Sequence, residues 1–443
     1  MKAGARALLI GYAVTNQAVA RALVRRGVEV VVGDDRPTDA GRAVAGDLGV
    51  ELIEAPGRDA LVHMVARADA VFPSPGVPDR HPVFAVAAAL GVPVRSEFDL
   101  ARGLDHRPVL AVTGTDGKTT VTTLATHMLE ASGRRAVTAG NTELPLVAAI
   151  DDPDVEVFVV EASSFRLAHT ERFEPLVATW LNFAADHLDA HASVDVYEAA
   201  KARIWRDQDT AATAVGNGED PVVAAHLAGA PARHVEFGLV IGDYRVDDRV
   251  LVTPGGDVMA TTDELWRSFP HDIANALAAA ATVLPGGATV AGVRSALLAF
   301  GGLPHRVSLV GEAGGVRFYD DSKATAPHAT LAALRAVDSV VLIAGGRNKA
   351  LDLSVLAAEA RRVRAVVAIG EAADDIGRAF SGVCPVTVAV TMADAVSRAA
   401  GLAEPGDVVL LSPGCASFDW YSSYAERGDD FARWVRELTG ATA

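Results

Sequence analysis

The sequence predicts an α/β protein built from three domains. Apolar segments of strand length alternate with helix-like segments along the chain, which is typical of parallel sheets covered by helices. With 443 residues, the chain is longer than a single hydrophobic core usually organises. A glycine-rich turn carrying Lys-Thr joins one strand to the following helix. We expect the domains to span residues 1–97, 98–302 and 303–443.

The first domain opens with a strand–helix–strand unit. A strand at 7–10, a helix at 15–26 and a strand at 28–32 imply a parallel sheet and a Rossmann-like domain. The turn after the first strand keeps only the first glycine, Gly11, of the G-x-G-x-x-G pattern, so we do not expect a dinucleotide cofactor. The acidic pair Asp34-Asp35 could bind hydroxyl groups of another nucleotide.

A phosphate-binding loop opens the second domain. An apolar strand at 108–112 runs into T-G-T-D-G-K-T-T at 113–120 and then into a helix, which predicts a central domain of the P-loop ATPase type. Backbone N–H groups of such a loop bind phosphate oxygens, Lys118 contacts the outer phosphates and the Thr119 hydroxyl binds Mg²⁺. Val112 stands where the strict eight-residue pattern has glycine, so the match is to a narrower variant. The alternative is a glycine-rich turn before an ordinary helix.

Two further strand ends of this domain carry candidate metal ligands. Glu161 ends the strand at 155–160, and His187 follows the strand at 177–182. A carboxylate at a strand end beside a triphosphate is a natural Mg²⁺ ligand. Glu161 could equally be an acidic residue at a helix start, and a lone histidine is usually structural.

Lys201 is an unusual residue within a predicted helix. Val194, Tyr197, Lys201 and Ile204 follow one another at spacings of three, four and three, which puts Lys201 on the apolar face. A lysine in that position extends its ammonium to solvent, pairs with a partner, or loses its charge. In the last case it could react with CO₂ to give a carbamate that acts as an extra carboxylate for Mg²⁺.

The third domain again alternates strands and helices, so we expect a C-terminal Rossmann-like α/β domain. Its strands are predicted at 316–319, 340–344, 365–369 and 407–411, and polar or glycine-bearing turns follow several of them. In open α/β sheets such turns line the ligand site.

Composition narrows the function classes. The net charge of −16 disfavours nucleic-acid and anionic-membrane partners. The two cysteines, Cys384 and Cys415, imply no disulfide framework, and no apolar run is long enough to span a bilayer. We read the N-terminus as a first strand rather than a signal peptide, and we expect a cytoplasmic protein without membrane insertion.

Taken together, these motifs resemble the Mur ligase family. They recur in family order as T-G-T-D-G-K-T-T (113–120), G-N (140–141), E-A-S-S-F (161–165), N-F-A-A-D-H-L-D (182–189), Y-E-A-A-K-A-R-I (197–204), G-L-P-H-R (302–306), D-D-S-K-A-T (320–325), L-S-P-G-C-A-S-F-D (411–419) and E-R-G (426–428). The Rossmann-like first domain resembles that of the members that add alanine or glutamate, and the 411–419 block resembles that of the member that adds D-glutamate.

The resemblance implies an ATP-dependent ligase that adds D-glutamate to UDP-N-acetylmuramoyl-L-alanine through an acyl phosphate, in the synthesis of a peptidoglycan precursor for the cell wall. It implies small-molecule substrates, ATP, two Mg²⁺ sites and a carbamylated Lys201, and we expect a monomer. Two alternatives stay open: a Mur-type ligase with another acceptor such as L-glutamate, and a non-catalytic paralogue that binds a UDP-sugar.

The resemblance also implies roles for individual residues. The catalytic and metal-binding residues would be Lys118, Thr119, Glu161, His187 and Lys201. ATP would contact Gly114, Thr115, Asp116, Gly117, Lys118, Thr119, Thr120, Asn275, Arg306 and Asp321. The UDP group would lie against Val14, Thr15, Asp35, Arg36, Ser74 and Gly76, with Asn141 near the reacting carboxylate. Glutamate would contact Thr325, Lys349, Ser417 and Tyr424.

The chain departs from the family pattern at several turns. Asp116 adds negative charge to the phosphate loop, and Glu143, Arg166 and Asp272 replace an expected Gly, Gln and Asn. These departures bear on the identity of the substrates more than on the ligase chemistry.

Overall fold

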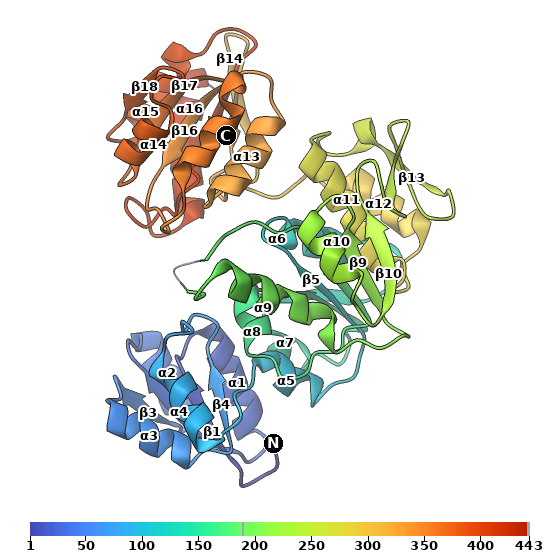
Figure 1. Ribbon diagram of the computed structural model, residues 1–443, viewed down its shortest axis with the longest axis vertical. Coiled ribbons are helices and arrows are strands. Elements are labelled where there is room, and N and C mark those ends of the chain that lie inside the picture. Colours follow the sequence, from blue (N-terminus) through green and yellow to red (C-terminus); the bar gives the residue numbers. More distant parts are fainter. Residues whose placement is uncertain (188–189, 441–443) are drawn as a thin grey trace. The chain divides into compact units, whose positions relative to one another are not determined.

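The computed structural model describes residues 1–187 and 190–440 (Figure 1). They form two compact units. The first contains Met1–Ala185, Ala190–Ser268 and Asp272–Phe300, and the second contains the chain from Gly301 onward with residues 186–187 and Phe269–His271. Each unit combines helices with parallel strands, so the predicted α/β fold class is confirmed.

The first sheet of the first unit has four parallel strands in the order β3-β2-β1-β4. Its elements are β1 (Arg6–Ile10), α1 (Val14–Val24), β2 (Glu29–Asp34), α2 (Asp39–Leu48), β3 (Glu51–Glu54), α3 (Arg58–Ala66), β4 (Ala70–Pro73) and α4 (Pro82–Leu90). The central strand β1 is an apolar run buried along most of its length, as expected for a strand covered by helices on both faces. Because β1 lies between β2 and β4, the turns that follow these three strands lie at the same edge.

The second sheet has six parallel strands in the order β10-β9-β8-β5-β7-β6. Its elements are α5 (Glu97–Arg102), β5 (Val109–Thr113), α6 (Lys118–Ala131), β6 (Ala136–Gly140), α7 (Leu146–Ala149), β7 (Val157–Glu161), α8 (Ser164–Ala168), β8 (Val177–Trp180), α9 (Val194–Arg206), β9 (Thr213–Asn217), α10 (Pro221–Leu227) and β10 (Arg233–Phe237). Val112 is in register with Glu161, and Thr113 with Trp180. The carboxyl ends of β5, β7 and β8 therefore meet.

A small antiparallel sheet follows, which the sequence analysis did not anticipate. It consists of β11 (Arg245–Asp247), β12 (Val250–Val252) and β13 (Val258–Thr261). The short helix η1 (Thr262–Glu264) leads to α11 (Pro270–Val283) and α12 (Val290–Ala299), and α12 packs against both α6 and β13.

The second unit contains a six-stranded sheet in the order β14-β15-β19-β16-β17-β18. Its elements are β14 (Ser308–Ala313), β15 (Val316–Asp320), α13 (Pro327–Arg335), β16 (Val340–Gly345), η2 (Leu353–Arg362), β17 (Val363–Ile369), α14 (Ala373–Ala379), β18 (Val386–Val388), α15 (Met392–Leu402), β19 (Val408–Leu411) and α16 (Tyr424–Thr439). Only the edge strand β14 pairs antiparallel. The predicted strands of this region are confirmed.

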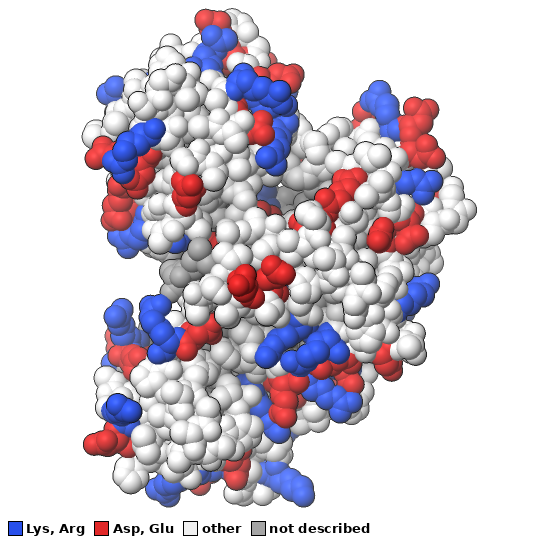
Figure 2. Space-filling model, in the orientation of Figure 1, with Lys and Arg blue, Asp and Glu red and all other residues white. Residues whose placement is uncertain are grey.

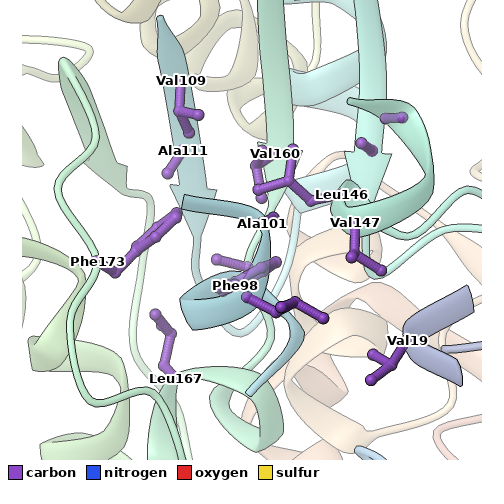
Figure 3. Packing of buried hydrophobic residues seen from close by; sticks show 14 of the residues in the cluster. Val19, Phe98, Ala101, Val109, Ala111, Leu146, Val147, Val160, Leu167 and Phe173 are labelled. Atoms are coloured by element: carbon purple, nitrogen blue, oxygen red, sulfur yellow. The ribbon is translucent and has the colours of Figure 1, made fainter. Parts of the chain in front are cut away.

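One hydrophobic core connects the first two sheets (Figure 3). Val19 of α1, Phe98 of α5 and Val147 of α7 are fully buried members of this cluster, and α1 contacts both α5 and α7. A continuous core fixes the first sheet to the second, which places the carboxyl-end turns of both sheets within one compact unit.

No helix among the described residues is long and apolar enough to cross a membrane.

Candidate active site

The phosphate loop connects β5 to α6. Gly117 directly precedes α6 and has φ 83°, in the left-handed region that favours glycine. A Cβ atom at this position would lie 2.5 Å from Oδ1 of Asn275, a residue of α11 that was expected to contact ATP. The helix begins at Lys118, so Thr119 and Thr120 lie in its first turn. This loop and helix N-terminus have the geometry of an anion-binding site.

Asn182, which follows β8, holds the phosphate loop in shape. Its side-chain Oδ1 accepts hydrogen bonds from the backbone N of Thr115 (3.0 Å) and of Asp116 (2.9 Å), and its carbonyl accepts a third from Thr115 N at 3.1 Å. Asn182 was not predicted as a site residue, although it begins the motif at 182–189. The last two residues of that motif, Leu188 and Asp189, lie outside the described residues.

Two lysines converge on one carbonyl of the loop. The Nζ atom of Lys118 donates to the carbonyls of Gly114 and Thr115, both at 2.8 Å. The Nζ atom of Lys201 donates to the same Gly114 carbonyl at 2.6 Å. The structure thus brings the lysine of α9 into contact with the phosphate loop, as its candidate role requires.

Lys201 is buried, as its spacing predicts. Its exposed fraction is 1%, which excludes an ammonium that extends to solvent. The Nζ atom lies 4.5 Å from the centroid of the Tyr197 ring, and the Tyr197 hydroxyl bonds to Oγ1 of Thr115 at 3.2 Å. The Gly114 carbonyl and the face of the Tyr197 ring both stabilise this buried cation.

Glu161 ends β7 beside the loop. Its Oε1 accepts a hydrogen bond from Nδ2 of Asn141 at 3.0 Å, so the two predicted site residues meet. Its Oε2 is buried and has no hydrogen-bond partner, and the same holds for the hydroxyls of Thr113 and Ser163. Buried polar atoms of this kind normally bind a partner, and a carboxylate oxygen with hydroxyls suits Mg²⁺. These residues therefore fit a magnesium ion, although no ready-made cluster of three or more His, Cys, Asp or Glu ligands occurs among the described residues.

The second unit contains His187 and all four expected glutamate-binding residues. Nε2 of His187 lies 3.4 Å from Oδ2 of Asp186, and Nζ of Lys349 lies 3.6 Å from Oδ1 of Asp186 and 3.4 Å from Oγ1 of Thr325. Burial alone would raise the pKa of Asp186, but the hydrogen bond from His328 and the charges of His187 and Lys349 lower it below its usual range. Lys349 and Thr325 thus lie together beside an ionised carboxylate.

Arg427 connects two other predicted site segments. This guanidinium, 1% exposed, donates to Oγ (2.9 Å) and the carbonyl (2.8 Å) of Ser322 and to the carbonyl of Cys415 (3.1 Å). It therefore joins the D-D-S-K turn after β15 to the turn after β19 that contains Ser417. The sequence did not predict this role of Arg427, because the E-R-G motif does not indicate which carbonyls the guanidinium contacts.

The same two turns share a second set of contacts. Oγ of Ser412 bonds to Oδ2 of Asp321 at 2.7 Å, and the ammonium of Lys323 lies 3.8 Å from the centroid of the Tyr424 ring.

Arg306 lies between two residues with left-handed backbone, His305 at φ 59° and Val307 at φ 51°. A β-branched residue in that region is strained, and such strain is concentrated at functional turns.

The residues expected to hold the UDP group lie in the turns after β2 and β4 and, for Val14 and Thr15, in the first turn of α1, which follows the turn after β1. Gly11 has φ 74°, and a Cβ atom there would lie 3.0 Å from Cβ of Ser74, so the first and third turns touch. Asp34 accepts hydrogen bonds from the backbone N of Tyr12 (2.6 Å) and of Arg36 (2.7 Å). The structure thus brings these turns together, with exposed members at Val14 and Asp35 and buried ones at Thr15 and Ser74. Gly76 lies in the same turn as Ser74.

Two of the departures from the family pattern form buried ion pairs. Asp272 accepts two hydrogen bonds from Arg267, one from Nε at 2.6 Å and one from Nη2 at 2.8 Å. Arg166 donates to Glu97 at 2.5 Å. Glu143, by contrast, is exposed.

Comparisons with known proteins match nearly the whole chain. A model of the Mur ligase middle domain matches residues 112–283, and one of the Mur ligase glutamate ligase domain matches residues 305–415. A protein of Frankia casuarinae named UDP-N-acetylmuramoylalanine–D-glutamate ligase is 44% identical over 463 residues, covering 99% of this chain and 95% of that protein. A protein of the same name from Desulfosudis oleivorans is 41% identical, with 98% and 96% covered.

Solved structures show the same fold at low identity. The UDP-N-acetylmuramate-alanine ligase MurC of Thermotoga maritima aligns with a TM-score of 0.59 at 19% identity, covering 98% of this chain and 99% of that one. MurF ligase of Thermotoga maritima, in complex with ADP, aligns with a TM-score of 0.60 at 17% identity, covering 100% and 96%.

Proposed function

The chain belongs to the Mur ligase family, and on that premise we propose that it joins D-glutamate to UDP-N-acetylmuramoyl-L-alanine at the expense of ATP. The observation that carries the proposal is full-length similarity to relatives named for that reaction, at 44% and 41% identity. The product would be a precursor of peptidoglycan. The dependence on ATP and on a UDP-linked substrate supports a cytoplasmic location.

The phosphate loop would bind ATP. Mur ligases use ATP with Mg²⁺, and Lys118 with the first N–H groups of α6 would neutralise the γ-phosphate as it is transferred. Asn275, beside Gly117, would contact adenine. The resemblance to Mur ligases also assigns ATP contacts to Arg306 and Asp321. Thr119, Glu161 and His187 would hold Mg²⁺ in two sites. The bound Mg²⁺ would shield the charge of the phosphoryl group. The unpartnered Oε2 of Glu161 supports this assignment.

Lys201 would act as a carbamate. The neutral amine would attack CO₂, form an N–C bond and release a proton, which replaces a buried cation with a carboxylate that could ligate Mg²⁺. Its burial supports the proposal, because a buried lysine loses its charge readily.

The reaction would run in two steps. A carboxylate oxygen of the UDP-linked substrate, oriented near Asn141, attacks the γ-phosphorus of ATP, and ADP leaves. The amine of glutamate then attacks the acyl carbon, loses a proton, and phosphate departs with the bridging oxygen. Lys349 and Thr325, with Ser417 and Tyr424, would bind the incoming glutamate, since an ammonium and hydroxyls suit its carboxylates. Exclusion of water from the site protects the acyl phosphate.

An isotope experiment tests this path. UDP-N-acetylmuramoyl-L-alanine labelled with ¹⁸O in its carboxylate should transfer one ¹⁸O atom to inorganic phosphate for each amide formed. Mass spectrometry of the released phosphate measures this transfer. Unlabelled phosphate with labelled amide would exclude the acyl phosphate.

A different acceptor, such as L-glutamate, is the second candidate. Ala326 and Ala350 directly follow Thr325 and Lys349 and stand where the resemblance to Mur ligases leads us to expect Asn and Gly. A non-catalytic UDP-sugar-binding role is disfavoured by the presence of Lys118 and Lys201 in contact with one loop carbonyl.

A further inference from the structure

Helix α8, which begins at Ser164 shortly after Glu161, is connected by side-chain hydrogen bonds to two segments that follow strands of the first sheet. Arg166, in α8, donates from Nη2 to Oγ1 of Thr15 at 3.1 Å. Ser164, also in α8, bonds through its Oγ to Nε2 of His191 at 3.0 Å, and Nδ1 of His191 lies 3.2 Å from Oδ2 of Asp79. Thr15 follows β1, and Asp79 follows β4.

Both connecting side chains are shielded from solvent. The side chains of Arg166 and His191 are 4% and 1% exposed, and their polar atoms contact Thr15 and Asp79 rather than open solvent. Each acts through another residue instead. Thr15 lies in the turn that the proposed function assigns to the UDP group, and Asp79 continues the turn that contains Ser74 and Gly76.

The Arg166 contact is a buried ion pair. Glu97 accepts from Arg166 at 2.5 Å and caps α7 by accepting from Val147 N at 3.0 Å. Burial of two charges costs desolvation that their attraction only partly offsets, so such a pair contributes more to fixing a geometry than to stability. The guanidinium is also close enough to Glu161 for their charges to attract.

The His191 contact is equally constrained. Its ring stacks on Phe165 with centroids 5.2 Å apart, and it lies 5.4 Å from the ring of Tyr197. Tyr197 in turn bonds to Thr115 of the phosphate loop. His169, at the end of α8, adds a second imidazole 3.5 Å from the other oxygen of Asp79.

We propose that Arg166 and His191 are positioning residues for the UDP-linked substrate: through Thr15 and Asp79 they fix both UDP-binding turns against the strand end that bears Glu161. This inference rests on the proposed function, which places the UDP group in those turns. It accounts for the arginine at 166 as a structural connection between two sites.

Two variants remove the connections without leaving a buried charge alone. Glu97→Gln with Arg166→Met removes the ion pair and the bond to Thr15, whereas the amide oxygen of the new side chain can still accept from Val147 N. His191→Phe keeps the ring between Phe165 and Tyr197 but removes both nitrogen contacts.

Two further variants complete the set. Arg166→Lys keeps the charge but cannot reach Glu97 and Thr15 together. Arg25→Gln is the matched control, since it removes the exposed Arg25–Asp151 pair that also joins the first sheet to the second.

Calorimetry on the full chain should show that UDP-N-acetylmuramoyl-L-alanine binds about tenfold more weakly to the double variant and to His191→Phe, with ATP binding changed less than about twofold. In assays of the double variant and of His191→Phe, the KM for the UDP precursor should rise about tenfold while kcat changes less than about twofold. Arg166→Lys should recover part of this loss. Arg25→Gln should have the KM and kcat of the wild type. Parallel weakening of both ligands with a lower melting temperature would show a purely structural role and overturn the inference, as would unchanged precursor binding. A wild-type chain that fails to bind the precursor would instead overturn the proposed function.

Discussion

Lys201 is the residue at which sequence and structure give the sharpest chemical information. Its helical spacing predicts burial, and its ammonium lies within 2.6 Å of the Gly114 carbonyl with almost no exposure. Lys118 donates to the same carbonyl. The helical spacing thus predicts the burial of Lys201, and the structure adds the loop carbonyl that its ammonium contacts.

Lys201→Ala should abolish ligation, because it removes the amine that would form the carbamate. Millimolar formate or acetate should restore part of the activity, since a free carboxylate would occupy the space left by the side chain. Phosphate release measures both effects, and Lys2→Ala at an exposed site is the control. Full activity of Lys201→Ala without added acid would exclude a carbamate role.

His305 should titrate above its ordinary range. Its Nδ1 lies 2.6 Å from Oδ2 of Asp320, and this hydrogen bond, opposed by burial and aided by the charge of Asp320, raises the pKa of His305. A raised pKa means that the pair stabilises the fold fully below about pH 6.5 and that this contribution is lost as the pH rises through the folded pKa.

Proton NMR of the His305 ring measures this directly. Asp320→Asn should return the pKa of His305 toward about 6.5. A midpoint at or below that value in the wild type would contradict the assignment of the ion pair.

Contacts between residues far apart in the sequence could not be predicted. The burial of Lys201 follows from neighbours within one helix. The Arg166–Glu97 pair joins positions 69 apart, and Asn182 reaches a loop 66 positions away. No periodicity in a single sequence relates residues whose contact depends on how two elements pack.

At the scale of elements, the junction of β5 and α6 depends on one glycine. Gly117→Ala would place a Cβ atom 2.5 Å from Asn275 at a φ of 83°. We expect the free energy of unfolding to fall by at least about 1 kcal/mol and ATP to bind more weakly. The reason is that alanine disfavours left-handed backbone and that its Cβ atom would clash with Asn275.

Gly133→Ala is a matched control for this change. Gly133 has φ 80°, but a Cβ atom there would meet nothing within 4 Å. It should lower stability through backbone strain alone and leave ATP affinity unchanged. Equal ATP affinity in the two variants, measured by calorimetry, would contradict the role of the loop.

Elements were predictable where the pattern was long and apolar. The helix around Lys201 and the parallel strands β1, β2, β5, β7, β8, β15, β16, β17 and β19 follow from such patterns, whereas β3, β6, β9, β10 and β18 were not predicted. Strands β11 and β12 have three residues each and little periodicity, so their antiparallel sheet could not be recognised. The antiparallel direction of β14 depends on tertiary pairing, which strand propensity does not specify.

At the scale of the whole molecule, the proposed substrates are anionic although the chain itself carries a net charge of −16. On the face shown in Figure 2, acidic and basic side chains are interspersed. Under the proposed function, binding of these substrates therefore depends on individually placed groups: Lys118 and the start of α6 in the first unit, and Lys349 in the second. The domain boundaries at 97 and 302 and a monomeric state stay predictions. The shared core around Val19 and Val147 explains why the first two sheets form one compact unit.

The central claim is the identity of the amide formed, and an acceptor panel tests it most directly. Phosphate release should be measured with ATP, Mg²⁺ and UDP-N-acetylmuramoyl-L-alanine in the presence of D-glutamate, L-glutamate, L-alanine or no amino acid, with mass spectrometry of each product. We predict stoichiometric phosphate release and amide formation with D-glutamate alone. Ligation of L-glutamate in place of D-glutamate, or no release with any acceptor, would contradict the claim.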